Sequence, residues 1–236
     1  MARTQREDAQ VAALLAGLDG SQDRLFRETC AAWVAASPRF RAFLAAYAAK
    51  VTKKLHHADG VEGRHDVLLE LCAAHRLLLD HRFALDYERY AAAKTRGPDF
   101  TVTFKTRTTF NLEVKRLRTS VELGRWANML CDKLGQMPPS IINVLLIGCD
   151  EGAAAAPDVE AAMARLQALA ERKDDEFFGH RGLLSPREYL RQLGRLSAIV
   201  LIPAWDRATA DPLSLWSNPQ ANHPLPRDLL RALGAL

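Results

Sequence analysis

Three residues that can take part in acid–base or metal chemistry lie within residues 97–118. Asp99 comes first, and Glu113 and Lys115 follow it, two residues apart from each other. Two carboxylates that meet at one end of a hairpin are oxygen ligands for a hard divalent cation, above all Mg²⁺. Such an ion can neutralise a phosphate and lower the pKa of a bound water, and a lysine beside it can position that water. The alternative is a surface hairpin whose solvent face carries charges, which is common in sheets.

Two short alternating segments predict the strands that would position these residues. Apolar side chains recur at every second position, at Phe100, Val102 and Phe104 in the first segment and at Phe110, Leu112 and Val114 in the second. Because successive side chains of a strand point to opposite faces, Glu113 and Lys115 share a face and lie about 7 Å apart. Asp99 falls on the same face of the neighbouring strand. We therefore expect a hairpin that holds the three side chains together on its non-core face.

The segment before the hairpin predicts a helix from Val67 to about His81, with Asp66 as its N-cap. Its apolar stripe consists of Val67, Leu71, Ala74 and Leu78. At about 100° per residue, Glu70 lies about 60° from the axis of this stripe, at its edge. An acid in that position is either a boundary residue that reaches water or a group directed at something buried.

The remaining pattern divides the chain into three regions. Residues 1–57 are predicted to form an N-terminal helical region, and the glycine-containing segment 58–65 is expected to link it to the main domain. That domain is expected to be α/β and to span 58–202, and residues 203–236 are expected to wrap around it as a tail. Further predicted elements are helices at 7–18, 22–36, 38–57, 120–135, 157–172, 185–193 and 226–233, and strands at 83–90, 141–147 and 197–202.

The charge of the chain is mild overall but unevenly distributed. The formal net charge is +4 and the isoelectric point is about 9.0. The window 94–125 holds eight basic and three acidic residues, a net +5, so the remaining residues sum to −1. Positive charge around the candidate site is what a phosphate-backbone ligand requires, and a solvated basic surface is the alternative.

Cysteine usage and hydropathy favour a reduced, cytoplasmic protein without a membrane partner. The four cysteines form no CxxC element and have no histidine pair beside them at zinc spacing. We therefore expect Cys30, Cys72, Cys131 and Cys149 to be reduced and mostly buried. Residues 1–8 lack the apolar core of a signal peptide, and the longest apolar runs are too short to span a membrane.

The order of these features resembles the PD-(D/E)xK nuclease superfamily: a helix that carries Glu70, a strand, Pro98-Asp99, Glu113-Val114-Lys115, a helix and a buried strand. This superfamily includes type II restriction enzymes, Holliday-junction resolvases, and repair and defence nucleases. Isolated P-D and E-x-K motifs are common by chance, so the agreement of motifs, strands, face parity and charge carries the resemblance. It covers roughly residues 61–150 and implies a restriction-endonuclease-like αβββαβ core with a mixed sheet.

The resemblance implies a role for each residue of the motif. Asp99 and Glu113 correspond to ligands of Mg²⁺, with Mn²⁺ as a substitute. Lys115 corresponds to the residue that orients or deprotonates the attacking water. Glu70 matches a helical acid that some members use for a second metal ion or for a water, so it is a candidate catalytic residue and metal ligand as well.

Other polar residues would surround this centre. Lys133 and Gln136, on and just after the next helix, fall where some members place a polar residue that faces the site. Backbone phosphate contacts, which position a nucleic acid rather than determine its sequence, are expected from Lys94, Arg96, Arg116 and Arg118.

These expectations lead to a metal-dependent endonuclease that hydrolyses DNA phosphodiester bonds. A homodimer is compatible with this activity, since nucleases that cut both strands are often dimers. A second interpretation is a catalytically silent module of the same fold that binds nucleic acid or protein. A third is an α/β protein in which the motif is accidental, and in that case Asp99 and Glu113 should not converge.

Overall fold

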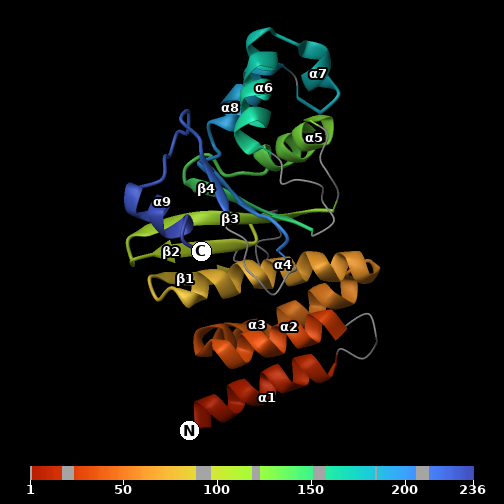
Figure 1. The fold of residues 1–236 in the computed structure, drawn as a ribbon, viewed down its shortest axis with the longest axis vertical. Helices are drawn as coiled ribbons and strands as arrows, with labels where there is room; N and C mark the ends of the chain where they lie inside the picture. Colours follow the sequence, from red (N-terminus) through yellow and green to blue (C-terminus); the bar gives the residue numbers. More distant parts are fainter. Residues whose placement is uncertain are drawn as a thin grey trace. The chain divides into compact units, whose positions relative to one another are not determined.

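The computed structural model describes residues 2–17, 24–88, 97–118, 123–150, 158–183, 185–205 and 213–236 (Figure 1). The chain folds into two compact units, and the boundary between them lies between Tyr87 and Glu88. The chain is α/β, with helices that precede, connect and follow the strands. The boundary that the sequence suggested between residues 57 and 58 lies between two helices of the first unit.

The first unit is mainly helical. Its described elements are α1 (Ala2–Ala16), α2 (Arg24–Ala36), α3 (Pro38–His57), α4 (Gly60–Leu79) and the strand β1 (Phe83–Tyr87). Helix α3 packs against α1, α2 and α4. Ser37 begins α3 as predicted, because its hydroxyl oxygen accepts a hydrogen bond from the Phe40 amide and Pro38 occupies the first turn.

The linker expected at 58–65 is wrong, because only Ala58 and Asp59 separate α3 from α4. Gly60 takes a positive φ of 61° and begins the helix, so one glycine is enough for the turn. Gly63 lies inside α4, where a Cβ would come within 3.1 Å of Ala58. Glycines that suggested a loop therefore permit a tight helix–helix connection. Asp66 is not a cap, because it lies inside α4.

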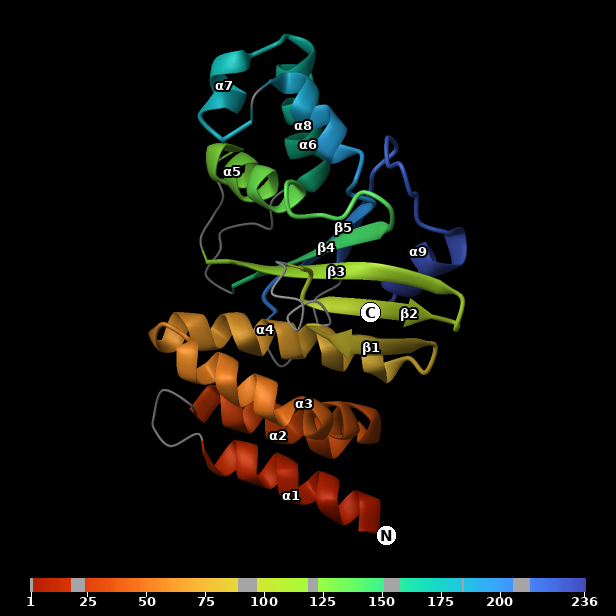
Figure 2. The same ribbon diagram turned by 180° about the vertical axis from the view of Figure 1, so that it is seen from behind.

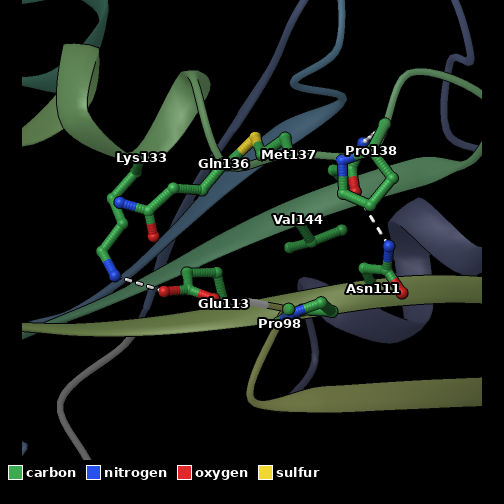
Figure 3. A pocket seen from close by; sticks show the side chains of 10 residues that line it. Pro98, Asn111, Glu113, Lys133, Gln136, Met137, Pro138 and Val144 are labelled. Atoms are coloured by element: carbon green, nitrogen blue, oxygen red, sulfur yellow. Dashed lines mark hydrogen bonds and ion pairs between the residues drawn. The ribbon is translucent and has the colours of Figure 1, made fainter. Parts of the chain in front are cut away.

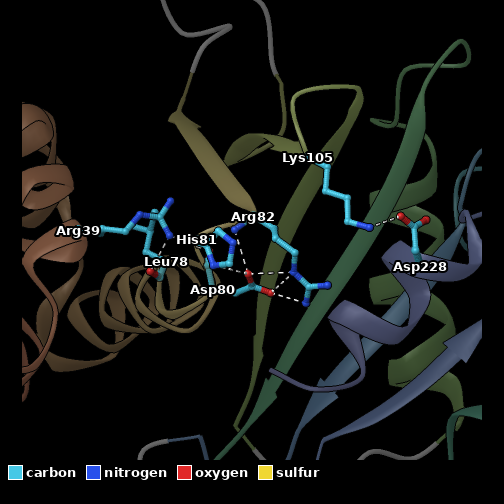
Figure 4. A network of polar contacts seen from close by, with 7 residues as sticks. All are labelled: Arg39, Leu78, Asp80, His81, Arg82, Lys105 and Asp228. Atoms are coloured by element: carbon cyan, nitrogen blue, oxygen red, sulfur yellow. Dashed lines mark hydrogen bonds and ion pairs between the residues drawn. The ribbon is translucent and has the colours of Figure 1, made fainter.

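Charged side chains fasten the ends of elements inside each unit (Figure 4). In the first unit, the Arg39 guanidinium donates to the carbonyls of Leu78 at 2.9 Å and Asp80 at 2.7 Å, and also to that of Phe83. The Arg82 guanidinium beside Asp80 lowers the pKa of that carboxyl below its usual range. These contacts join α3 to the end of α4 and the start of β1.

The second unit contains a mixed sheet. Its described elements are β2 (Phe100–Phe104), β3 (Thr108–Leu117), α5 (Leu123–Leu134), β4 (Ile142–Cys149), α6 (Val159–Glu171), α7 (Asp175–Gly179), α8 (Pro186–Leu193), β5 (Ala198–Ile202), β6 (Ser214–Ser217) and α9 (Arg227–Leu233). These strands are ordered β2-β3-β4-β5-β6. The β2–β3 and β5–β6 pairs are antiparallel, whereas β3–β4 and β4–β5 are parallel. Helices in the connections between the parallel strands supply the required crossovers.

Apolar cores cover both faces of the central strands. On one face, Leu145 and Ile147 of β4 and Leu201 of β5 join the core that includes Trp126 and Leu130 of α5. Helices α5, α6 and α8 lie over this face (Figure 2). On the other face, buried residues include Phe100, Leu112, Val114, Val144, Leu146 and Val200. The continuous apolar runs of β4 and β5 follow from this double burial, as predicted.

The polar face of the hairpin, which was expected to lie away from the core, is covered in part. Thr101 and Asn111 lie on that face, and their exposed fractions are only 4% and 1%. Leu117, on the same parity of β3, belongs to the core beneath α5. A crossover helix must pack on the sheet that it connects, so alternation distinguishes the two faces without showing which one is covered.

Smaller differences concern turns and the C-terminal region. The hairpin turn occupies residues 105–107, and both Lys105 and Thr106 take positive φ although neither is glycine. The Lys105 ammonium contacts Asp228 of α9 at 2.9 Å, which fastens this turn (Figure 4). Asp174 caps α7, because its side chain accepts a hydrogen bond from the Phe177 amide. The tail contributes strand β6 to the sheet.

Two sequence expectations on cysteines and membranes can be compared with the structure. All four cysteines are buried and none forms a disulfide, as expected. Burial raises the pKa of the Cys131 and Cys149 thiols to about 11, so both stay protonated at neutral pH. Among the described helices, none is both long enough and apolar enough to cross a membrane.

Candidate functional site

Asp99 lies just before β2 and next to β3. Phe100 pairs with Leu112 at the end of the β2–β3 ladder, and Asp99 is the residue before this pair. The main chain at Asp99 is fixed by its carbonyl, which accepts a hydrogen bond from the Glu88 amide at 2.8 Å.

Each of these two carboxylates has a defined partner. Oδ2 of Asp99 accepts a hydrogen bond from the backbone amide of Val114 at 2.8 Å, so the side chain lies against the neighbouring strand. Oε1 of Glu113 forms an ion pair with the ammonium of Lys133 (Figure 3). No hydrogen bond joins the second carboxylate oxygen of Glu113 to a described residue. One oxygen of Glu113 is therefore available to a ligand.

Lys133 reaches the site because of its place on α5. It lies seven residues after Trp126, which is almost two full helical turns, so the two side chains leave the helix in nearly the same direction. Trp126 is buried in the core against the sheet. Lys133 is thus a cation on the sheet-facing stripe of the helix, and this spacing is the sequence signal that could have shown that it faces the sheet.

Lys115 has a different environment. It lies on the same strand face as Glu113 and is opposite Ile147 of β4. Its side chain is exposed, and within the described part of the chain its ammonium makes no hydrogen bond or ion pair. The lysine that contacts Glu113 is therefore Lys133, which the sequence suggested only as a surrounding polar residue.

A small pocket lies next to this ion pair, with a cavity of about 10 Å³. That is close to the smallest volume that holds one water molecule. Glu113 and Asn111 of β3, Lys133 of α5 and Gln136 of the following turn contribute its polar lining. The amide end of Gln136 points toward Lys133 and Glu113 (Figure 3). Gln136 therefore lines the pocket beside Glu113 and Lys133.

Buried amides hold the turn that carries Gln136. The Asn111 Nδ2 donates to Asn143 Oδ1 at 3.1 Å, and Asn143 Nδ2 donates to the Pro138 carbonyl at 2.8 Å. These bonds connect β3 and β4 to the chain just after α5 (Figure 3). Asn143 was not suggested by the sequence, because nothing in a continuous apolar strand indicates which polar residue supports a turn.

Glu70 belongs to the first unit, and its contacts there are extensive. Its two carboxylate oxygens accept hydrogen bonds from the Lys54 ammonium at 2.9 and 2.7 Å. The Tyr87 hydroxyl donates a third hydrogen bond to Oε2 at 2.6 Å. The Lys54 ammonium also lies 5.1 Å from the centre of the Tyr87 ring. Glu70 therefore connects α3, α4 and β1 within its unit.

The four expected phosphate contacts have different placements. Lys94 and Arg96 lie outside the described residues. Arg118 is exposed at the end of β3. Arg116 is only 8% exposed, and its guanidinium donates two hydrogen bonds to Asp150, which also accepts one from the Trp205 indole. Arg116 lies on the same covered strand face as Val114. It is therefore too buried to make the expected phosphate contact.

Asp99 and Glu113 are the carboxylates that could hold one Mg²⁺ ion. Mg²⁺ usually binds one or two carboxylates and retains several waters. Groups of three or more metal-binding side chains are absent from the residues that the structure describes. The chain matches no family model, and no curated protein or solved structure matches it. The candidate site is thus defined by its own geometry.

Proposed function

We propose that this protein is a Mg²⁺-dependent nuclease that hydrolyses DNA phosphodiester bonds, with Asp99 and Glu113 as the metal ligands. The observation that carries this proposal is the hydrogen bond from the Val114 amide to Oδ2 of Asp99 at 2.8 Å, which holds this carboxylate against β3 beside the residue that follows Glu113. Glu70 is not included, because its carboxylate is engaged by Lys54 and Tyr87.

The order of elements supports a restriction-endonuclease-like core. Along the chain, α4 and β1 are followed by β2, β3, α5 and β4. Strands β2 and β3 are antiparallel, and α5 lies between the parallel strands β3 and β4. This is the arrangement that an αβββαβ core with a mixed sheet requires of these elements. Fold alone does not determine activity, so the proposal depends on the site.

Several residues of the chain would each have a separate role in hydrolysis. A bound Mg²⁺ would neutralise charge on the phosphate and lower the pKa of a coordinated water. The hydrogen bond from the Val114 amide holds the Asp99 carboxylate in place. Lys115, exposed on the same face, is positioned to contact the phosphate or to orient the attacking water. Arg118, at the end of the same strand, would position the nucleic-acid backbone.

Charge-removing substitutions test this assignment. Asp99→Asn and Glu113→Gln should each reduce Mg²⁺-dependent cleavage by more than about 100-fold, because each removes an anionic oxygen ligand without changing side-chain size. Lys115→Ala should also reduce cleavage. The substrates would be plasmid DNA, short duplexes, single strands and RNA. Cleavage would be measured by gel analysis of the products.

Asp132→Asn is the matched control, since Asp132 is an exposed carboxylate on α5 next to Lys133. It should leave cleavage within about twofold, as expected for a surface substitution that removes no ligand. Circular dichroism spectra would verify that each variant is folded. Sustained cleavage by Glu113→Gln at the wild-type rate would contradict the assignment.

A second candidate function is a binding module that does not cut. The observation that favours it is the Lys133–Glu113 ion pair, because a carboxylate neutralised by an ammonium does not need a metal. Titration of DNA binding against salt, with and without Mg²⁺, separates the two. A steep salt dependence that is unaffected by Mg²⁺, with no products after long incubation, favours the module.

A further inference from the structure

Lys133 occupies the position beside Glu113 where a metal ion would bind. Its ammonium pairs with one oxygen of the only carboxylate among the pocket's lining residues. Both side chains are largely shielded from water, with exposed fractions of 20% for Lys133 and 15% for Glu113. A carboxylate with so little exposure is costly to leave without a counter-charge. Lys133 therefore supplies the positive charge that Glu113 needs in the protein without metal.

An ammonium and a divalent ion cannot both hold Glu113 at close range. An ammonium is a hydrogen-bond donor and not a ligand, so it shares no coordination with a metal. The repulsion between a charge of +2 and a charge of +1 is twice that between two unit charges at the same distance. The four-carbon stem of lysine allows its ammonium to move away while the helix stays in place.

We propose that the Lys133 ammonium competes with a divalent metal ion for Glu113, so that the ion binds only when Lys133 leaves the carboxylate. This inference rests on the proposed role of Glu113 as a metal ligand. An ion pair formed about nine-tenths of the time would weaken the apparent metal affinity about 10-fold, because only the open fraction binds. The released ammonium would then be a second cation, next to Lys115, for the phosphate of a nucleic acid.

Lys115 provides a matched comparison within the same strand face. It carries the same charge as Lys133, but its ammonium makes no hydrogen bond or ion pair with a described residue. Lys133→Gln and Lys115→Gln therefore remove one positive charge each, and only the first removes the competitor. A difference between them isolates contact with Glu113 from a general change in charge.

Metal affinity is the first measurement. Mn²⁺ binding to the full chain, followed by electron paramagnetic resonance, should be about 10-fold tighter for Lys133→Gln than for the wild type. Lys115→Gln should change the affinity by less than about threefold, because screened surface charge contributes little. Equal affinities of Lys133→Gln and wild type, or equal effects of the two substitutions, would overturn the proposal.

A second measurement uses the unsubstituted protein and does not depend on whether Lys133→Gln folds. Nuclear magnetic resonance of ¹⁵N-labelled lysine ammonium groups should show slowly exchanging signals from shielded, ion-paired lysines, which include Lys54 and Lys133. The signal assigned to Lys133 should disappear as Mg²⁺ is added, whereas that of Lys54 should persist. Persistence of the Lys133 signal at saturating Mg²⁺ would overturn the competition while leaving the metal site intact. No binding of Mg²⁺ or Mn²⁺ by the wild type or by Lys133→Gln would instead overturn the proposed function together with this inference.

Discussion

In each unit a shielded glutamate pairs with a lysine. The two pairs differ in how many of the carboxylate oxygens accept a hydrogen bond. Glu70 and Glu113 have similar exposed side-chain fractions, 13% and 15%. Glu70 accepts two hydrogen bonds from Lys54 and one from Tyr87, so both of its oxygens are engaged. Glu113 is bound through one oxygen by Lys133. Carboxylates of similar exposure therefore differ in their bonding. Both oxygens of Glu70 accept hydrogen bonds, which we call a closed network, whereas only one oxygen of Glu113 is bound.

This comparison teaches that residue type and burial do not separate a structural acid from a functional one. The sequence placed both glutamates in the same candidate site, because each is an acid at the edge of an apolar pattern. What separates them is the number of unused acceptors and the space beside them. A cavity adjoins Glu113, and the carboxylate of Asp99 accepts a hydrogen bond from the amide of Val114, the next residue of β3. A ligand would thus find a carboxylate oxygen without a hydrogen bond to a described residue at Glu113, whereas both oxygens of Glu70 already accept one.

The largest effect on stability is expected from Glu70→Gln. This change removes the charge that pairs with the shielded Lys54 ammonium, and it weakens the bond from Tyr87. We expect a loss of about 2 to 3 kcal/mol in the free energy of unfolding. Glu113→Gln breaks one ion pair and should cost about 1 kcal/mol. Urea titration followed by circular dichroism would measure both.

Cleavage should show the opposite order. Glu113→Gln is expected to abolish it, while Glu70→Gln should keep activity within about threefold under conditions where the protein is folded. If Glu70→Gln removed cleavage and left stability unchanged, the comparison would fail. Glu70 would then be a catalytic or metal-binding residue, as the resemblance implied.

The hydrogen bond from Tyr87 is the next part of the closed network to test. Tyr87→Phe removes a single hydroxyl that donates to Glu70 at 2.6 Å and should cost about 1 to 2 kcal/mol, the range for a hydrogen bond to a charged group. Tyr47→Phe is the matched control, because its ring packs 5.8 Å from that of Tyr87 but its hydroxyl bonds no described residue. Thermal unfolding would compare the two, and equal losses would show that the hydroxyl bond contributes nothing.

The sequence predicted strands more reliably than the environment of their faces. Alternation located β2 and β3, and continuous apolar runs located β4 and β5, because these patterns reflect burial directly. Alternation could not show that Thr101 and Asn111 are covered, since the covering helix is separate in sequence. The glycines at 60 and 63 favoured a loop because glycine in a turn and glycine at a helix–helix contact are indistinguishable without the partner.

The site was predictable in part for the same reason. Strand parity and the P-D and E-x-K spacing suggested that Asp99 and Glu113 lie close together, and Asp99 accepts a hydrogen bond from the amide of Val114, the residue after Glu113. The pairing of Glu113 with Lys133 depends on how α5 packs on the sheet, which is not local. The spacing of seven residues from Trp126 could have indicated that Lys133 faces the sheet, but not which acid it would meet. The burial of Arg116 against Asp150 was inaccessible to the sequence for the same reason.

The smallest expected effect concerns protonation of the first unit. His75 of α4 stacks on Trp33 at 5.1 Å and meets the edge of Phe40 at 5.3 Å. Burial, together with the nearby Arg76, lowers the pKa of His75 to about 4. Its Nε2 is buried and has no hydrogen-bond partner among the described residues. The neutral ring is therefore the form that fits this aromatic cluster.

The consequence for stability follows from comparing the folded and unfolded states. An unfolded histidine titrates near pH 6.5, so between about pH 6.5 and pH 4 the unfolded chain binds more protons at this residue than the folded one. The stabilising contribution is present above pH 6.5 and is lost as the pH falls toward 4. His75→Phe keeps an aromatic ring between Trp33 and Phe40 but cannot be protonated. Its urea midpoint should therefore fall less than that of the wild type between pH 7.5 and pH 5, and parallel decreases would show that His75 does not carry this pH dependence.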